Sequence, residues 1–95
     1  MQKFYVYMLK CSDSSYYIGH TDDLEKRVAE HNAAKCAGYT STRLPVTLVY
    51  AEAVASRYEA LVAEHKIKKW SRKKKEALIA GDWSRISELC SRKKT

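Results

Sequence analysis

The sequence predicts a small α+β domain in which helices flank a three-stranded antiparallel sheet, in the order β-β-α-β-α-α. An aromatic hairpin pattern opens the chain, two helical patterns enclose one more apolar strand, and a basic helical segment follows. The chain has 95 residues, 45% of them apolar, which is enough for one modest core. We therefore expect one domain over residues 1–90, with residues 91–95 as a disordered basic tail.

Residues 4–21 form the predicted hairpin, because both arms are rich in aromatic and β-branched residues and Ser-Asp-Ser-Ser separates them. Alternate residues of a strand point to opposite faces, so the turn length decides which side chains meet. An odd turn, with Leu9 opposite Tyr17, places Tyr7 and Tyr17 on one face, whereas an even turn separates them. The alternative is that these tyrosines are ordinary strand residues with their hydroxyls in solvent.

The next pattern predicts a helix over residues 24–32, with Thr21 or Asp22 as its N-cap. Arg27 and His31 are four residues apart and therefore project together from one margin of its apolar stripe. Taken alone, such an arginine usually covers apolar surface with its stem, and a lone histidine is usually structural.

Residues 33–45 lack periodicity and contain the only proline, so they are predicted to form a loop. In this loop, Thr40 and Arg43 can donate hydrogen bonds to phosphate, although Thr/Ser loops more often satisfy their own backbone. Residues 46–54 are too apolar for a strand with one face in water. We expect them to form the third strand, covered on both faces.

A capping box at residues 56–59 begins the second helix. Helical spacing places Glu64 in the middle of an apolar stripe that also contains Ala60 and Ile67. A buried, ionised carboxylate requires a cation, a metal ion or strong hydrogen bonds beside it. Alternatively, the helix is rotated so that Glu64 pairs with Lys68 four residues later.

Positive charge is concentrated near the C-terminus. Residues 1–65 carry 7 Lys/Arg and 8 Asp/Glu, whereas residues 66–95 carry 11 Lys/Arg and 3 Asp/Glu, a net charge of +8. Such a segment favours a polyanionic partner, above all nucleic acid, although charge runs are usually only solvated faces. The residues predicted to contact nucleic acid here are Lys66, Lys69, Arg72, Lys73, Lys74 and Lys75.

Several classes of protein are disfavoured. The sequence contains no apolar run near the ~18 residues of a membrane span and no signal-peptide pattern, so we expect a cytoplasmic protein without a membrane partner. Its three cysteines are odd in number and widely spaced, which predicts free thiols and no zinc site. The sequence does not indicate an oligomeric state.

The tripeptides Tyr5-Val6-Tyr7 and Tyr17-Ile18-Gly19 resemble the paired signature of the GIY-YIG nuclease family, in the variant of small stand-alone bacterial members. Tyr5 replaces the usual first glycine. Further similarity lies at Arg27, in residues 39–50 and at Glu64, so the resemblance covers roughly residues 3 to 80.

This resemblance implies the same architecture and an active site on one sheet face beside the first two helices. It implies catalytic roles for Tyr7, Tyr17, Arg27, His31 and Glu64. Glu64 would hold one Mg²⁺ or Mn²⁺, and Arg27 would clamp the phosphate. Tyr17 would be the base and Tyr7 would orient it, or the two would exchange these roles, and His31 would assist proton movement.

The implied function is that of a metal-dependent DNA endonuclease, with DNA repair or recombination as candidate settings. One departure concerns an Asn that some members carry late in the domain, because no Asn follows Glu64. The alternative is a non-catalytic nucleic-acid-binding module, for DNA or RNA, that retains the nuclease fold. Basic helices do not distinguish between DNA and RNA.

Overall fold

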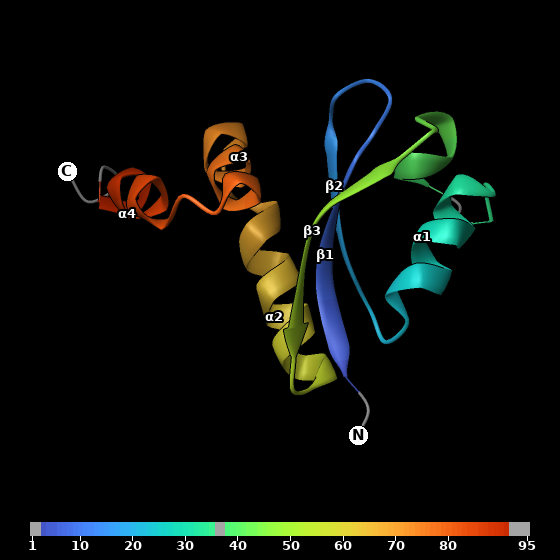
Figure 1. Cartoon of the computed structure of the whole chain (residues 1–95), viewed down its shortest axis with the longest axis horizontal. Helices are drawn as coiled ribbons and strands as arrows, with labels where there is room; N and C mark the ends of the chain where they lie inside the picture. The colour runs from blue at the N-terminus through green and yellow to red at the C-terminus, as the bar shows by residue number, and fades with distance from the viewer. Residues whose placement is uncertain (1–2, 36–37, 92–95) are drawn as a thin grey trace.

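The computed structural model describes residues 3–35 and 38–91, and the side chains of residues 89–91 are not described. It confirms the predicted α+β fold, with an antiparallel sheet of strand order β2-β1-β3 (Figure 1). The strands are β1 (Phe4–Lys10), β2 (Tyr16–Thr21) and β3 (Thr47–Val54). The helices are α1 (Leu24–Asn32), the 3₁₀ helix η1 (Tyr39–Thr42), α2 (Arg57–Lys68), α3 (Arg72–Ala80) and α4 (Trp83–Ser91).

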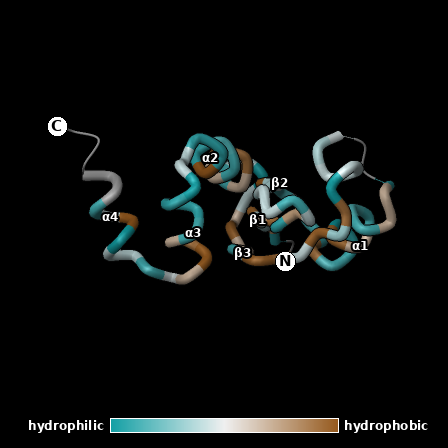
Figure 2. Tube along the Cα trace, turned by 90° about the horizontal axis from the view of Figure 1, so that it is seen from above, coloured by the Kyte–Doolittle hydropathy of each residue, from teal (hydrophilic) through white to brown (hydrophobic). Residues whose placement is uncertain are grey.

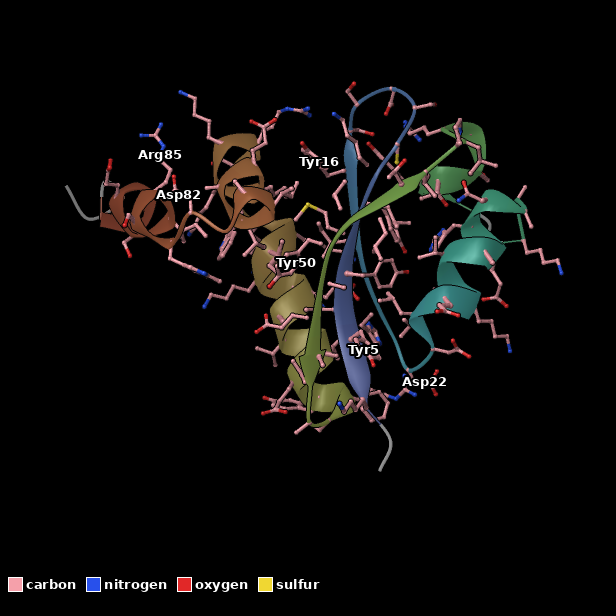
Figure 3. All side chains as sticks on the ribbon, in the orientation of Figure 1. Tyr5, Tyr16, Asp22, Tyr50, Asp82 and Arg85 are labelled. Carbon is pink, nitrogen blue, oxygen red and sulfur yellow. The ribbon has the colours of Figure 1, made fainter. Side chains whose placement is uncertain are left out.

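The hairpin has an odd turn, which is one of the two alternatives that the sequence left open. Lys10 pairs with Tyr16 and Leu9 with Tyr17, which leaves residues 11–15 as the turn. Tyr7 and Tyr17 therefore share one face, and their ring centroids are 6.4 Å apart. Figure 3 shows the same alternation along the hairpin, with Tyr5 on the side of α1 and Tyr16 on the side of α3.

The sheet separates two small apolar clusters, and helices cover each of them (Figures 1 and 2). On one face, α1 packs Leu24 and Val28 against Tyr7 and Leu9 of β1. On the other face, α2 and α3 pack against β1 and β2. The buried members of this second cluster are Val6, Met8, Ile18, Ile67, Ala77, Leu78 and Ile86. Each face of β1 is thus buried under a different helix layer.

Two predictions are wrong: the identity of the N-cap of α1 and the burial of β3. The N-cap of α1 is Asp23, whose carboxylate accepts from the Lys26 amide at 3.2 Å, while Thr21 bonds the Asp23 amide. β3 is not covered on both faces, because it lies at the sheet edge and pairs only with β1. Leu48 of β3 is 38% exposed.

The capping box predicted at residues 56–59 is confirmed, and α3 has its own caps. Ser56 caps α2 by accepting from the Glu59 amide, and Ser71 caps α3 in the same way. Gly81 ends α3 with a φ of 72°, the left-handed conformation that favours glycine. The final helix α4 lies against α3, farthest from the sheet in Figure 1.

The described part of the chain has no helix that is both long and apolar enough to cross a membrane. Cys11 is a buried free thiol. Cys36, the side chain of Cys90 and the predicted tail beyond Ser91 lie outside the described residues.

Candidate nuclease site

A chain of three buried polar side chains lies on the α1 face. The Tyr7 hydroxyl is 3.0 Å from Nε2 of His31, and the Thr40 hydroxyl is 2.8 Å from Nδ1 of the same ring. All three residues are at most 2% exposed. Because Thr40 belongs to η1, this chain joins three segments: β1, α1 and the loop before β3.

His31 is held neutral in this chain. Burial disfavours the charged ring and the neighbouring Arg27 repels the added proton, so the pKa of His31 lies below its ordinary value. A neutral imidazole has one donor and one acceptor nitrogen, and a hydroxyl can match either. The ring can therefore accept from Tyr7 while donating to Thr40, or the reverse.

Tyr17 lies beside this chain and is more accessible. Its ring centroid is 5.2 Å from that of His31, and the residue is only half-buried. Gly19, opposite Tyr7 in the hairpin, makes this arrangement possible, because a Cβ there would lie 2.5 Å from the Tyr7 hydroxyl. The Tyr17-Ile18-Gly19 motif thus requires a glycine at position 19, because the Tyr7 side chain occupies the space of a Cβ there.

Glu64 is the buried carboxylate that the sequence predicted, at 8% exposure. Its Oε1 lies 2.5 Å from Nδ1 of His20, and its Oε2 lies 2.7 Å from Nζ of Lys68. Burial alone would raise the pKa of the Glu64 carboxyl, but the hydrogen bonds from His20 and Lys68 outweigh burial and hold the pKa below its usual value. The carboxylate is therefore ionised at neutral pH. The helix is not rotated as in the alternative interpretation, because Glu64 is buried in the stripe with Ala60 and Ile67, but the carboxylate does pair with Lys68.

The structure does not place all five expected catalytic residues on one sheet face. His20 pairs with Val6, and its partner Glu64 belongs to α2, so this pair lies on the face opposite Tyr7 and Tyr17. The expectation of a single-face site is corrected accordingly. The reason is the alternation of β2, in which positions 17 and 20 point to opposite faces.

The two faces meet at the free edge of β2. A cavity of about 640 Å³ lies there, with His20 at the end of β2, Arg27 from α1 and Arg57 from α2 in its wall. Arg27 connects the cavity to the tyrosine face, because its charge also acts on His31 one helical turn later. The remaining lining residues are Thr21, Asp22, Asp23, Lys26 and Glu30.

The chemistry of Glu64 fits a hard divalent cation. Mg²⁺ usually takes one or two carboxylates and keeps several waters, so a single ionised carboxylate beside a cavity is sufficient. Both oxygens are bonded here, and the partner that can leave is Lys68, whose side chain is 50% exposed. Within residues 3–35 and 38–91, no group of three or more His, Cys, Asp or Glu side chains gathers as an all-protein metal site.

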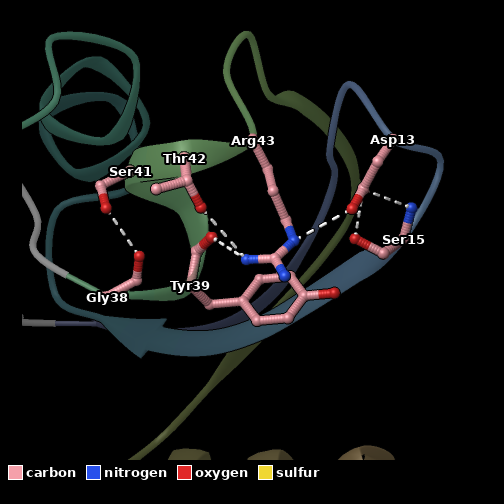
Figure 4. Close-up of polar contacts among 7 residues, drawn as sticks. All are labelled: Asp13, Ser15, Gly38, Tyr39, Ser41, Thr42 and Arg43. Carbon is pink, nitrogen blue, oxygen red and sulfur yellow. Dashed lines mark hydrogen bonds and ion pairs between the residues drawn. The ribbon is translucent and has the colours of Figure 1, made fainter.

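Two loop residues predicted to contact nucleic acid have other contacts. Thr40 is buried and its hydroxyl bonds His31, so it is not at the surface where a phosphate would lie. The Arg43 guanidinium lies 3.9 Å from the centroid of the Tyr39 ring and pairs with Asp13 of the hairpin turn at 3.0 Å (Figure 4). Arg43 therefore fastens η1 to the hairpin.

In the basic run, residues 66–75, several side chains make contacts within the protein, and some of the run is exposed to solvent. Lys68 pairs with Glu64, Arg72 pairs with Glu76, and Lys74 is 5% exposed with its ammonium 4.2 Å from the centroid of the Trp70 ring. Lys75 is half-buried, and burial lowers its pKa. The exposed members of the predicted nucleic-acid set are Lys66, Lys69, Lys73 and Arg72.

Sequence reasoning missed His20 and Arg57. The signal for His20 was available, because positions 16, 18 and 20 of β2 share a face and Ile18 is plainly apolar. Its pairing with a residue 44 positions away was not visible. Arg57 is the first residue of α2, and its place in the cavity depends on how α2 docks.

We expect the stability of the protein to fall as the pH drops below about 7 because of His31. The unfolded state carries a histidine of ordinary pKa, about 6.5, whereas the folded state holds it lower, so the unfolded state takes up more protons on acidification. The stability that the neutral His31 ring contributes is fully present above about pH 6.5 and is lost below it. Glu64 adds a loss in the same direction only near and below its own ordinary pKa of about 4.3.

Thermal unfolding of His31→Gln between pH 7.5 and 5.5 should show a flatter pH dependence than the parent, with lower stability at pH 7.5. The exposed His65 provides the control, since His65→Gln should keep the parental slope. An unchanged slope in His31→Gln would show that His31 does not titrate in this range.

Comparison with known proteins agrees with this architecture. The chain matches the family model of the GIY-YIG catalytic domain over residues 3–77. A UPF0213 protein of Staphylococcus haemolyticus is 51% identical over 79 residues, which is 83% of this chain and 96% of that protein. UPF0213 protein YazA of Bacillus subtilis is 49% identical over 75 residues, which is 79% of this chain and 76% of that protein.

Two solution NMR structures are also similar. A UPF0213 protein from Bacillus halodurans has a TM-score of 0.54 and 39% identity, covering 92% of this chain and 96% of that chain. The protein EF2693 from E. faecalis has a TM-score of 0.58 and 37% identity, covering 85% and 86%. Since the family match includes the paired tyrosine motifs, Arg27 and Glu64, the chain belongs to the GIY-YIG family, a nuclease superfamily.

Proposed function

We propose that the protein is a metal-dependent DNA endonuclease that binds a phosphodiester at the free edge of β2. One observation carries this proposal: the ionised, buried Glu64 is hydrogen-bonded to His20, and His20 lines a cavity together with Arg27 and Arg57. Positive groups and a carboxylate around one opening are what phosphodiester hydrolysis requires. DNA repair or recombination in the cytoplasm is the proposed setting.

Arg27 is the proposed phosphate clamp. A guanidinium is permanently charged and can bond two phosphate oxygens at once. Its side chain is 41% exposed and lines the cavity, so a bound phosphate can reach it. Arg57 lines the same cavity from α2 and supplies a second positive charge.

Tyr17 is the proposed base, and Tyr7 positions it. The buried Tyr7 hydroxyl is already bonded to His31, whereas Tyr17 is half-buried and therefore open to an attacking water. His31 is neutral, so its ring can accept a proton from the tyrosine pair. Thr40 fixes the orientation of the ring through the other nitrogen.

Glu64 is the residue that would hold Mg²⁺ or Mn²⁺, with Lys68 releasing one carboxylate oxygen. Such a cation supplies charge stabilisation for the phosphoryl oxygens. His20 would keep its bond to the other oxygen and so hold the carboxylate in place. In the absence of the cation, Lys68 and His20 balance the charge of Glu64.

The second candidate is a binding module, for DNA or RNA, that cleaves nothing. It is favoured by the same contacts, because a Glu64 whose oxygens are both engaged by His20 and Lys68 is already satisfied. The late Asn of some family members is also missing. A cleavage assay with Glu64 and Lys68 variants separates the two candidates.

Glu64→Gln should reduce Mg²⁺- or Mn²⁺-dependent cleavage of DNA by at least about 10²-fold, since the amide cannot replace an anionic ligand. It should also abolish the binding of Mn²⁺ measured by calorimetry. Lys68→Gln is the matched control, because it breaks the ion pair but leaves the carboxylate. This control should cleave and bind Mn²⁺ at least as well as the parent.

Equal cleavage by Glu64→Gln and the parent would rule out Glu64 as the metal ligand. Equal damage in both variants, with a large fall in Tm, would assign Glu64 to the ion pair alone. The substrates should include single-stranded, duplex, flapped and branched DNA.

Tyr17→Phe should lower kcat by about 10² or more with unchanged DNA affinity, as expected for loss of a general base. Tyr16→Phe is a control in the adjacent position, because its hydroxyl lies on the other face and loses only a 3.4 Å contact with Glu76. Single-turnover cleavage and fluorescence anisotropy measure the two quantities. If Tyr7→Phe were the only damaging change, the roles of the two tyrosines would be exchanged.

The exposed lysines of the basic run should bind the DNA backbone without reading sequence. About four phosphate contacts predict a slope of log K against log salt near −3.6. Replacing Lys66, Lys69 and Lys73 with Gln should flatten the slope by about 2.7 for all sequences alike. The control replaces Lys3, Lys10 and Lys35, which are exposed and carry the same total charge. Equal effects of the two triple variants would mean that net charge alone drives binding.

A further inference from the structure

We propose that a pocket between β3, α2, α3 and α4 binds an unpaired base of single-stranded DNA. This inference rests on the proposed function and extends it, because it assigns a substrate with unpaired nucleotides. The pocket has a volume of about 180 Å³. Its walls are Tyr50, Glu52, Ala63, Lys66, Ile67, Trp70, Leu78 and Trp83.

The size and the lining of the pocket suit a single flat ring system. Pockets for drug-sized molecules usually measure 300 Å³ or more, so this pocket takes a smaller group. Three of its eight lining residues are aromatic, and Trp83 at the start of α4 is 61% exposed. A solvated indole face gains free energy when a base stacks on it, whatever the base is.

The charges around the pocket favour a base inside and a phosphate outside. Lys66 lines the pocket and is exposed, as are Lys69 and Lys73, nearby in sequence. Glu52 also lines the pocket and accepts a hydrogen bond from the Tyr50 hydroxyl at 2.8 Å. A carboxylate repels a phosphate but can accept from the amine of a base. The backbone of a strand would therefore follow the lysines while one base enters.

The location of the pocket and the charge of the surrounding segment also favour nucleic acid as its occupant. The pocket lies on the flank of α2 toward β3, while Glu64 of the same helix faces His20 at the β2 edge. Tyr50 reaches into the α2 side of the sheet (Figure 3). Residues 66–95 carry a net charge of +8, which complements a polyanion and repels a second copy of this segment.

The test is a binding experiment in EDTA, which needs no cleavage. Fluorescence anisotropy compares a labelled single strand of about 12 nucleotides with a blunt duplex of the same sequence. Trp83→Ala should weaken binding of the single strand about tenfold or more and leave duplex affinity unchanged within about twofold. Trp83→Phe, which keeps an aromatic ring, should restore most of the affinity.

Two further measurements distinguish stacking from a general loss of structure. Tyr58→Ala removes another aromatic side chain, which is 74% exposed on α2 but outside the pocket, and it should leave both affinities unchanged. The single strand should quench the tryptophan fluorescence of the parent, and in Trp83→Phe this quenching should fall to the part that Trp70, the other tryptophan of the pocket, contributes.

Four results would overturn the proposal: equal losses for duplex and single strand, no loss in Trp83→Ala, tighter binding of an RNA strand of the same sequence, or a Trp83-dependent dimer of the parent in light scattering. Binding is measured without metal, so the two proposals fail separately. Trp83-dependent binding of the strand without any cleavage would contradict only the endonuclease function. Cleavage without an effect of Trp83→Ala on binding would contradict only the base pocket.

Discussion

The hairpin register is the constraint on which both halves of the candidate site depend. Tyr7 lies opposite Gly19, and its ring occupies the space that any Cβ at that position would take. A slip of one residue would turn Tyr7 toward α2 and expose the apolar side chains of β1, so the register is strongly selected. The same register directs His20 toward α2, where it meets Glu64.

Because β2 is an edge strand, Arg27 of α1 and Arg57 of α2, from helices on opposite faces, can line one opening. The face of α1 holds a neutral, hydroxyl-rich chain around His31, and the face of α2 holds the ionised Glu64. Arg27 lines the opening and is the cation whose charge acts on the His31 side.

Local chemistry made most of the fold predictable. The two arms of the hairpin, the bounds of α1 and the capping box that begins α2 all follow from short stretches of sequence, and each is confirmed. Predictions that needed the arrangement of whole elements were less successful. The exposure of β3 depends on its place at the sheet edge, and the bond between His20 and Glu64 depends on how α2 docks. Lys74 looked like a surface cation, but its burial over Trp70 depends on the angle between α2 and α3.

Stability alone does not account for Glu64. The residue lies between Ala60 and Ile67 on the buried side of α2, where an apolar side chain of similar size would avoid the desolvation of a charge. The bond to Lys68 returns little of that cost, because the lysine is half exposed and such pairs are worth about 0–1 kcal/mol. His20 is also partly exposed, at 24% of its side chain. A carboxylate kept ionised at this position, next to His20 of the cavity wall, is therefore what the proposed metal site would require.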